Sequence, residues 1–287
     1  MSEISGPSRR VKVEGAYNVR DVGAYTTKDG QRTRWKTFLR ADSLYRLSPD
    51  SQAALIEYGV RTVIDLRTTP ELQEEPNPYA NSPLVHYHHL NMDDDVPPSK
   101  TPDYKATRDP LLVEMMAEVA DAPASNPAAR RVQAATLGRL ESYGSRLDRR
   151  RPKIRDIMAT MAAPRGLPAL VHCAAGTDRT GIISALVLGI ARVPAKTIAA
   201  DYALSAIGLL ERDMADKTPR EIMEGDHTWQ RYQQVLSPSQ GMAKVLEYLD
   251  RRYGGIEAYV RRIGLTSDQI ESLRRTMLES PLASTIG

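Results

Sequence analysis

One segment constrains the fold more than any other: a short apolar run, a six-residue loop and a long apolar run. Residues 167–173 read LPALVHC, and residues 180–193 read TGIISALVLGIARV. The first run has the length of a strand and the second that of a helix, and neither alternates with polar residues. Because both faces of such elements must be covered, the pattern predicts a buried strand feeding a buried helix in an α/β domain.

The loop between these two runs, AAGTDR, carries the chemistry. A short loop that enters a helix points successive backbone N–H groups at one place, where the helix dipole adds partial positive charge. Cys173, the only cysteine of the chain, opens the loop and Arg179 closes it. Helix N-termini and cations favour the nucleophilic thiolate form of cysteine, and a guanidinium offers a planar fork to two phosphate oxygens. We therefore expect a nucleophile and an anion clamp at one phosphoryl group.

The other residues of the motif fit this interpretation. Gly176 lets the backbone curl close to an anion, and Ala174 and Ala175 leave room for it. We expect His172 to hydrogen-bond the loop from behind, and the Thr180 hydroxyl to donate to the thiolate. A lone cysteine at a strand end is commonly a small buried hydrophobic residue. The spacing of cysteine, arginine and threonine favours the catalytic alternative.

The rest of the chain divides into a strand-rich first half and a helical second half. Ser48 and Pro49 mark a helix start and Gly59 its end. The expected strands cover 35–41, 60–66 and 84–90, and the expected helices cover 108–121, 128–147, 152–163, 194–205, 207–224, 238–252, 254–263 and a last helix from a Thr266/Gln269 capping box. The sequence predicts a single α/β domain over residues 1–287, with a central, mostly parallel sheet flanked by helices and a helical insertion at about 104–150.

Composition limits the function classes. The chain has 287 residues, 41% hydrophobic, which is enough for a large core. A net charge of +3 does not indicate nucleic-acid binding. A single cysteine, no signal sequence and no apolar run of membrane-spanning length predict a cytoplasmic protein without stable membrane association, and leave signal-free secretion open.

The pattern H-C-x5-R-T on a strand, loop and helix resembles the protein-tyrosine phosphatase superfamily. More narrowly, HCAAGTDRTG is similar to the loop H-C-x-x-G-K-D-R-T-G of the bacterial PtpB-like tyrosine/serine phosphatases, a motif that ends in Gly181. Other segments also resemble this family, namely YNVRDVGAY (17–25), FLRADSLYRLS (38–48), VRTVIDLRTTPE (60–71), ADYALS (200–205) and YGGIEAYVRRIGLTSDQIESLR (253–274). The resemblance spans most of the chain outside about 104–165.

The resemblance implies a cysteine-phosphatase fold with a helical lid, and a phosphomonoesterase that works through a phosphocysteine intermediate without metal or cofactor. Its substrates would be phosphotyrosine, with phosphoserine or phosphothreonine, in proteins. Two alternatives stay open: the same chemistry on a small phosphorylated metabolite, or a non-catalytic phosphate-binding module. Thr177 stands where the family has a lysine associated with phosphoinositide and doubly phosphorylated substrates, and this departure favours the small-metabolite alternative.

The general acid has two candidates. Asp178 lies inside the loop, and Asp93 is the first of three aspartates that follow the strand at 84–90. We expect Asp178 to be the acid, because the family's loop keeps an aspartate directly before its arginine.

Several residues outside the loop are candidates for supporting it. Asp65 and Arg67 end a neighbouring strand and are expected to brace the loop, and Arg20 is expected to line the pocket with Asn18 and Asp21. A surface ion-pair network is the alternative explanation for these residues. His86 and His88 share a strand face and are compatible with a metal site, although strand alternation and packing explain them equally well.

Overall fold

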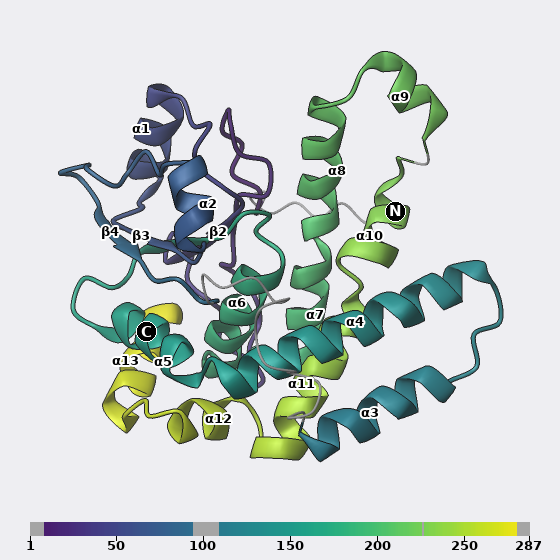
Figure 1. The fold of residues 1–287 in the computed structure, drawn as a ribbon. Helices are drawn as coiled ribbons and strands as arrows, with labels where there is room; N and C mark the ends of the chain where they lie inside the picture. Colours follow the sequence, from purple (N-terminus) through teal and green to yellow (C-terminus); the bar gives the residue numbers. More distant parts are fainter. Residues whose placement is uncertain (1–8, 94–108, 226, 280–287) are drawn as a thin grey trace, which may run out of the picture.

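The computed structural model describes residues 9–93, 109–225 and 227–279, and it contains a five-stranded sheet flanked by helices (Figure 1). In spatial order the strands are β1 (Arg20–Asp21), β2 (Phe38–Ala41), β5 (Ala169–His172), β3 (Thr62–Asp65) and β4 (His86–His89). Only β1 runs antiparallel to its neighbour. The predicted α/β class and mostly parallel sheet are therefore confirmed.

The register of the sheet determines where the loop lies. Every residue of β2, β3 and β5 is buried, as expected for parallel strands covered on both faces. His172 pairs with Ala41 of β2 on one side and with Asp65 of β3 on the other. The carboxyl ends of three strands therefore meet at one edge, which is the edge where open α/β sheets bind ligands.

The strand, loop and helix predicted from residues 167–193 are present. Helix α6 (Asp178–Ile190) follows β5 directly, and 10 of its 13 residues are buried. Four other helices pack around it, namely α5 (Arg151–Ala162), α7 (Ala195–Ala203), α12 (Ile256–Arg262) and α13 (Ser267–Met277). The predicted buried helix thus lies inside the helical layer.

The helix boundaries mostly follow the local signals in the sequence. The Ser48 side chain caps α1 (Pro49–Tyr58), and the Thr266/Gln269 capping box starts α13. Two helices were not predicted, α2 (Thr69–Glu74) and α10 (Trp229–Leu236). The single helix expected at 207–224 is wrong, because Thr218 and Glu221 form a capping box that separates α8 (Ser205–Ala215) from α9 (Pro219–Glu224).

Helices α3 (Pro110–Asp121) and α4 (Pro127–Arg149) lie where the insertion was expected, and Figure 1 shows them as a hairpin that extends to one side. Residues 104–108 of the expected insertion lie outside the described residues. Three side chains in the second half of α4 are fully buried: Leu140, Tyr143 and Leu147. Helix α11 (Ser239–Tyr253) packs against both α3 and α4. Leu112 and Met115 of α3 are also fully buried and share a small core with Leu140 and Tyr248, so a lid motion of α3 would have to open this core.

A buried ionic cluster joins α7 to the sheet. The Asp201 carboxylate lies 3.2 Å from Arg20 of β1 and 2.8 Å from Arg40 of β2, and all three side chains are at most 5% exposed. Burial favours the neutral acid, but the two arginines lower the pKa of Asp201 to about 2. The carboxylate is thus the shared counter-charge of two buried cations.

No helix within residues 9–93, 109–225 and 227–279 combines the length and apolar composition needed to span a bilayer.

We predict that Asp201→Asn lowers the free energy of unfolding by about 3–5 kcal/mol at pH 7, because it leaves two buried guanidinium groups without a counter-charge. The measurement is urea unfolding. Asp216→Asn is the matched control, since Asp216 pairs with Arg46 on the surface and contributes under about 1 kcal/mol. Equal losses in the two variants would contradict the prediction.

A comparison of the wild type with Asp201→Asn also predicts how stability depends on pH. A carboxylate whose pKa is lowered on folding stabilises the protein fully above its unfolded pKa, and this contribution is lost as the pH falls. The difference in stability between wild type and Asp201→Asn should therefore be constant at neutral pH. It should shrink as the pH falls from about 4 towards 2.

We propose that α3 and the first half of α4 act as a lid, and hydrogen exchange tests this. Amides of 110–121 and 127–139 should exchange faster than those of β5 and α6, and should gain protection when an oxyanion such as phosphate binds. Protection that is equal in both regions and unchanged by phosphate would contradict a lid.

Candidate active site

The loop between β5 and α6 is held from its outer side. Three successive carbonyl groups, those of residues 174–176, accept hydrogen bonds from outside the loop at 2.9–3.1 Å. The donors are the Ser43 N–H and Arg212 for Ala174, the Asn18 side-chain amide for Ala175, and Arg40 for Gly176. Because the carbonyls turn outward, the backbone N–H groups turn towards the interior of the loop.

These N–H groups form an anion cradle. In the described part of the chain, no hydrogen bond engages the backbone N–H groups of residues 174–179. Gly176 has a φ of +67°, and a Cβ on it would lie 2.5 Å from the carbonyl oxygen of Ala41. Only glycine fits this turn. The cradle suits a small anion with several oxygens, such as a phosphoryl group.

Cys173 starts the loop and is 2% exposed. Thr180 is fully buried, and its hydroxyl has no partner among the described residues, so the expected hydrogen bond to Cys173 is not formed in this structure. Thr177 is also buried, with its hydroxyl 3.3 Å from the Ala175 carbonyl oxygen. Its side chain therefore turns towards the loop and supplies no charge where the family has lysine.

Arg179 is oriented by a carboxylate that the sequence analysis did not identify. Its two terminal nitrogens each lie 2.6 Å from a carboxylate oxygen of Glu71, in α2. Burial opposes ionisation of Glu71, but the hydrogen bonds from Arg179 lower its pKa to about 2. Burial also disfavours the guanidinium, yet Glu71 and Cys173 raise the pKa of Arg179 above its ordinary value. The fork is therefore fixed in one plane beside the cysteine.

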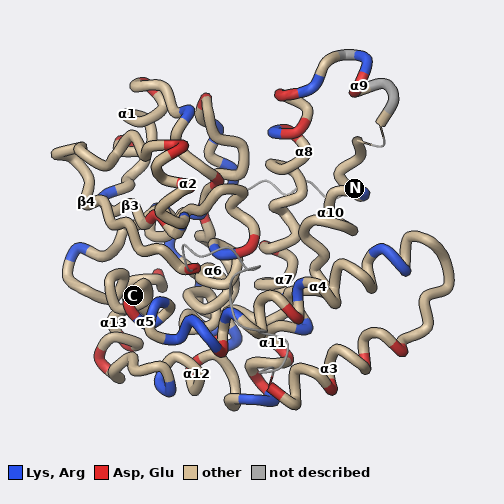
Figure 2. The backbone as a smooth tube through the Cα atoms, viewed as in Figure 1, with Lys and Arg blue, Asp and Glu red and all other residues tan. Residues whose placement is uncertain are grey.

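The two candidate acids both lie near α4. Asp178 accepts a hydrogen bond of 2.6 Å from Tyr143, and its side chain is 43% exposed. Asp93 is 21% exposed and lies 2.9 Å from Arg146 and 3.8 Å from Arg179. Figure 2 shows basic and acidic segments together around the start of α6. The other two aspartates of that run, at 94 and 95, lie outside the described residues.

Asp65, Arg67 and His172 form a buried group behind the loop. Arg67 lies 2.7 Å from Asp65, and both side chains are fully buried. His172 Nε2 lies 3.3 Å from Asp65 and 2.8 Å from the side-chain amide of Asn77, while its Nδ1 lies 3.3 Å from the Cys173 carbonyl oxygen. Burial opposes ionisation, but His172 and Arg67 lower the pKa of Asp65 well below its ordinary range. These residues support the loop and do not line it.

Arg20 and Asp21 also lie away from the loop interior. Arg20 belongs to the ionic cluster with Asp201 and donates to the side-chain oxygen of Asn18 at 2.6 Å. Asp21 is fully buried and accepts from the Tyr58 hydroxyl and two backbone N–H groups. Of the three residues expected to line the pocket, only Asn18 contacts the loop.

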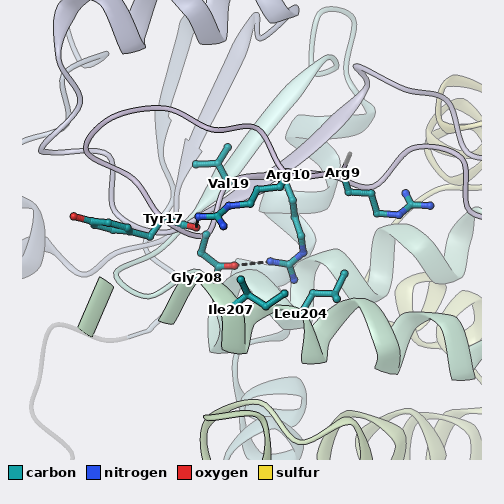
Figure 3. A pocket seen from close by; sticks show the side chains of 9 residues that line it. Arg9, Arg10, Tyr17, Val19, Leu204, Ile207 and Gly208 are labelled. Carbon is teal, nitrogen blue, oxygen red and sulfur yellow. Dashed lines mark hydrogen bonds between the residues drawn. The ribbon is translucent and has the colours of Figure 1, made fainter. Parts of the chain in front are cut away.

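A separate cavity of about 190 Å³ has Asn18 among its lining residues (Figure 3). Arg10 forms one wall and pairs with Glu211 of α8, and Leu204 and Ile207 form another. Neither Cys173 nor Arg179 lines this cavity. It is therefore distinct from the cradle.

His86 and His88 lie on the edge strand β4, and within the described residues no group of three His, Cys, Asp or Glu side chains is arranged to hold a metal ion.

Gly181 allows close packing between α6 and α7. A Cβ at this position would lie 3.1 Å from the Tyr202 ring, so the glycine lets that ring pack closely against α6.

The sequence analysis missed several residues that contact the site, among them Glu71, Asn77, Tyr143 and the three loop donors Arg40, Ser43 and Arg212. The sequence TTPE at 68–71, with proline at a first-turn position, is a capping-box signal that identifies α2 and places Glu71 at its start. Asn77 and Tyr143 have no such local signal, because only the tertiary fold brings them to the loop.

Comparisons with known proteins agree with this geometry. The chain matches the tyrosine phosphatase family over residues 11–279. It is similar to a tyrosine-protein phosphatase of Nostoc commune, with 29% identity over 246 residues that cover 83% of this chain and 72% of the relative. It is also similar to the triple specificity protein phosphatase PtpB of Mycobacterium tuberculosis, with 26% identity over 93% of this chain and 98% of the relative. The chain therefore belongs to the tyrosine phosphatase family and is a phosphatase.

Proposed function

We propose that this phosphatase hydrolyses phosphate monoesters through a phosphocysteine intermediate on Cys173. The observation that carries the proposal is the cradle: the N–H groups of residues 174–179, which directly follow the cysteine, are unengaged within the described chain, while the carbonyls of residues 174–176 are bound from outside. Arg179, fixed by Glu71, adds a positive charge at the same place. Preorganised donors of this kind stabilise the charge of a transferring phosphoryl group.

The reaction has two steps. In the first, the Cys173 sulfur attacks phosphorus and forms an S–P bond while the bond from phosphorus to the leaving oxygen breaks, and Asp178 gives its proton to that oxygen. In the second, the Asp178 carboxylate takes a proton from water, whose oxygen attacks phosphorus. The S–P bond breaks, and inorganic phosphate and the thiolate are released.

Geometry favours Asp178 over Asp93 as the acid. Asp178 is twice as exposed as Asp93, and Tyr143 and Arg139 both contact the same carboxylate oxygen, Oδ1, at 2.6 and 3.5 Å. Asp93 is bound by Arg146 through two nitrogens, at 2.9 and 3.3 Å, and its rotation would break that ion pair. Membership in the family and the aspartate's place directly before Arg179 support the same assignment.

The proposed substrate is phosphotyrosine in proteins, with phosphoserine or phosphothreonine as secondary substrates. The names of the two relatives, a tyrosine-protein phosphatase and a triple specificity protein phosphatase, support this substrate class. A small phosphorylated metabolite is the second candidate, because Thr177 leaves no cation at the loop position where the family has lysine. Values of kcat/KM for a panel of phosphopeptides and phosphometabolites separate the two: preference for a metabolite by more than tenfold would favour the second candidate.

We predict that Cys173→Ser lowers kcat by about 10⁴-fold or more, because the nucleophile is lost. Binding of inorganic phosphate, measured by calorimetry, should persist in this variant because the cradle and Arg179 remain. Arg179→Lys should lose activity and weaken phosphate binding, since a point charge cannot replace the bidentate fork. Near-normal turnover by Cys173→Ser would overturn the phosphocysteine mechanism.

We predict that Asp178→Asn slows alkyl phosphates far more than aryl phosphates. An alkoxide is a poor leaving group and needs the proton, so kcat should fall by about 10²–10³-fold for phosphoserine and by less than about tenfold for p-nitrophenyl phosphate. The alkaline limb of the pH profile should flatten, because it reports the group that must be protonated. Asp93→Asn is the matched control. If Asp93→Asn gives this pattern and Asp178→Asn does not, the acid is Asp93.

A further inference from the structure

A chain of polar side chains leads from Arg139 to Asp178. Arg139 Nε donates to the Tyr202 hydroxyl at 2.9 Å, the Tyr202 and Tyr143 hydroxyls lie 2.8 Å apart, and Tyr143 donates to Asp178 at 2.6 Å. Arg139 and Tyr143 belong to α4, and Tyr202 belongs to α7. Two helices outside the loop motif therefore reach the proposed acid.

The two ends of this chain fix its direction. An arginine only donates hydrogen bonds, and an ionised carboxylate only accepts them. The single proton of Tyr143 is used for Asp178, so the hydrogen bond between the two hydroxyls must come from Tyr202. Every donor in the chain thus points towards Asp178.

Burial makes the chain rigid. Tyr143 and Tyr202 are at most 1% exposed, and their rings meet edge to face at 86° with centroids 6.1 Å apart. The Tyr202 ring also packs against Gly181 of α6, one turn from Asp178. Burial, together with Tyr202 and Asp178, raises the pKa of Tyr143 well above its ordinary value, so its hydroxyl keeps its proton. The carboxylate is held by groups that cannot easily move.

We propose that Tyr143 is a positioning residue for Asp178, and that the directed chain from Arg139 through Tyr202 orients its carboxylate for proton transfer. This inference rests on the proposed role of Asp178 as the acid. A carboxylate next to Arg179 on a helix start has rotational freedom, and a displacement of about 1 Å at a reacting group is enough to cost 10²-fold in rate. The chain removes that freedom through contacts to Oδ1, while the Asp178 side chain stays 43% exposed.

The charged and titratable groups that face Asp178 are known from the structure. Arg139, Tyr143 and Arg146 face it from α4, and Tyr202 faces it from α7. Removing the Tyr143 hydroxyl takes away one donor to the ionised carboxylate and leaves both arginines in place. The alkaline limb of the profile of kcat against pH should therefore move to higher pH, by about one unit.

The test compares Tyr143→Phe with Tyr248→Phe. Tyr248 is an equally buried tyrosine whose hydroxyl donates to a carboxylate on α4, that of Asp148, at 2.7 Å. We expect both variants to lose similar thermal stability. Only Tyr143→Phe should lower kcat for phosphoserine, by about tenfold. Its kcat for p-nitrophenyl phosphate should change little, and the alkaline limb of its pH profile should move to higher pH. Tyr202→Phe keeps Tyr143 and should give a smaller effect in the same direction, so it replaces Tyr143→Phe if that variant does not fold.

The double variant Tyr143→Phe/Asp178→Asn completes the experiment. If Tyr143 acts through Asp178, the double variant should be no slower on phosphoserine than Asp178→Asn alone. If Asp178→Asn shows the leaving-group dependence but Tyr143→Phe matches Tyr248→Phe in rate and pH profile, the inference is overturned and the proposed function stands. If Asp178→Asn shows no leaving-group dependence, both the acid assignment and the inference are overturned.

Discussion

The site depends on where the carbonyl groups of one short loop point. Peptide units have opposite dipole ends, so binding three carbonyls from outside forces the neighbouring N–H groups inward. The outer donors come from separate places: the Asn18 side chain near β1, Arg40 and the Ser43 N–H at the end of β2, and Arg212 of α8. Asn18 is in turn held by Arg20, and Arg40 by Asp201. The cradle therefore depends on segments from both halves of the chain and not on the loop alone.

Arg40 shows how far this dependence extends. Its guanidinium binds Asp201 of α7 with one nitrogen and the Gly176 carbonyl with another. Asp201 is at the same time the counter-charge of Arg20 in β1. One buried carboxylate thus links the antiparallel edge strand, a central strand, a helix and the anion cradle. This explains why a chain can place so many ions in its interior: each charge is paired and hydrogen-bonded.

Much of this arrangement could be predicted from the sequence where the signal is local. The buried strand and helix at 167–193, the cap at Ser48 and the spacing from Cys173 to Arg179 are all contained in short segments, and the structure has those elements. Glu71 could have been found from its capping box. Tyr143 could not, because a buried tyrosine in an amphipathic helix looks the same whether its hydroxyl meets a carboxylate, as here, or a backbone carbonyl, as Tyr259 does. The expectation that Arg20 lines the pocket failed for the same reason, because its buried partner, Asp201, is 181 residues away.

The Glu71 carboxylate has two roles: it caps α2 and it binds Arg179. One of its oxygens accepts from both the backbone N–H and the hydroxyl of Thr68, which starts α2, and also from Arg179. The first turn of a six-residue helix therefore sets the position of the anion clamp. An insertion or deletion between Thr68 and Glu71 would move the carboxylate by about a third of a turn per residue, and the guanidinium with it. The number of residues from Thr68 to Glu71 must therefore stay the same for Arg179 to keep its position, even though this segment touches no reacting atom.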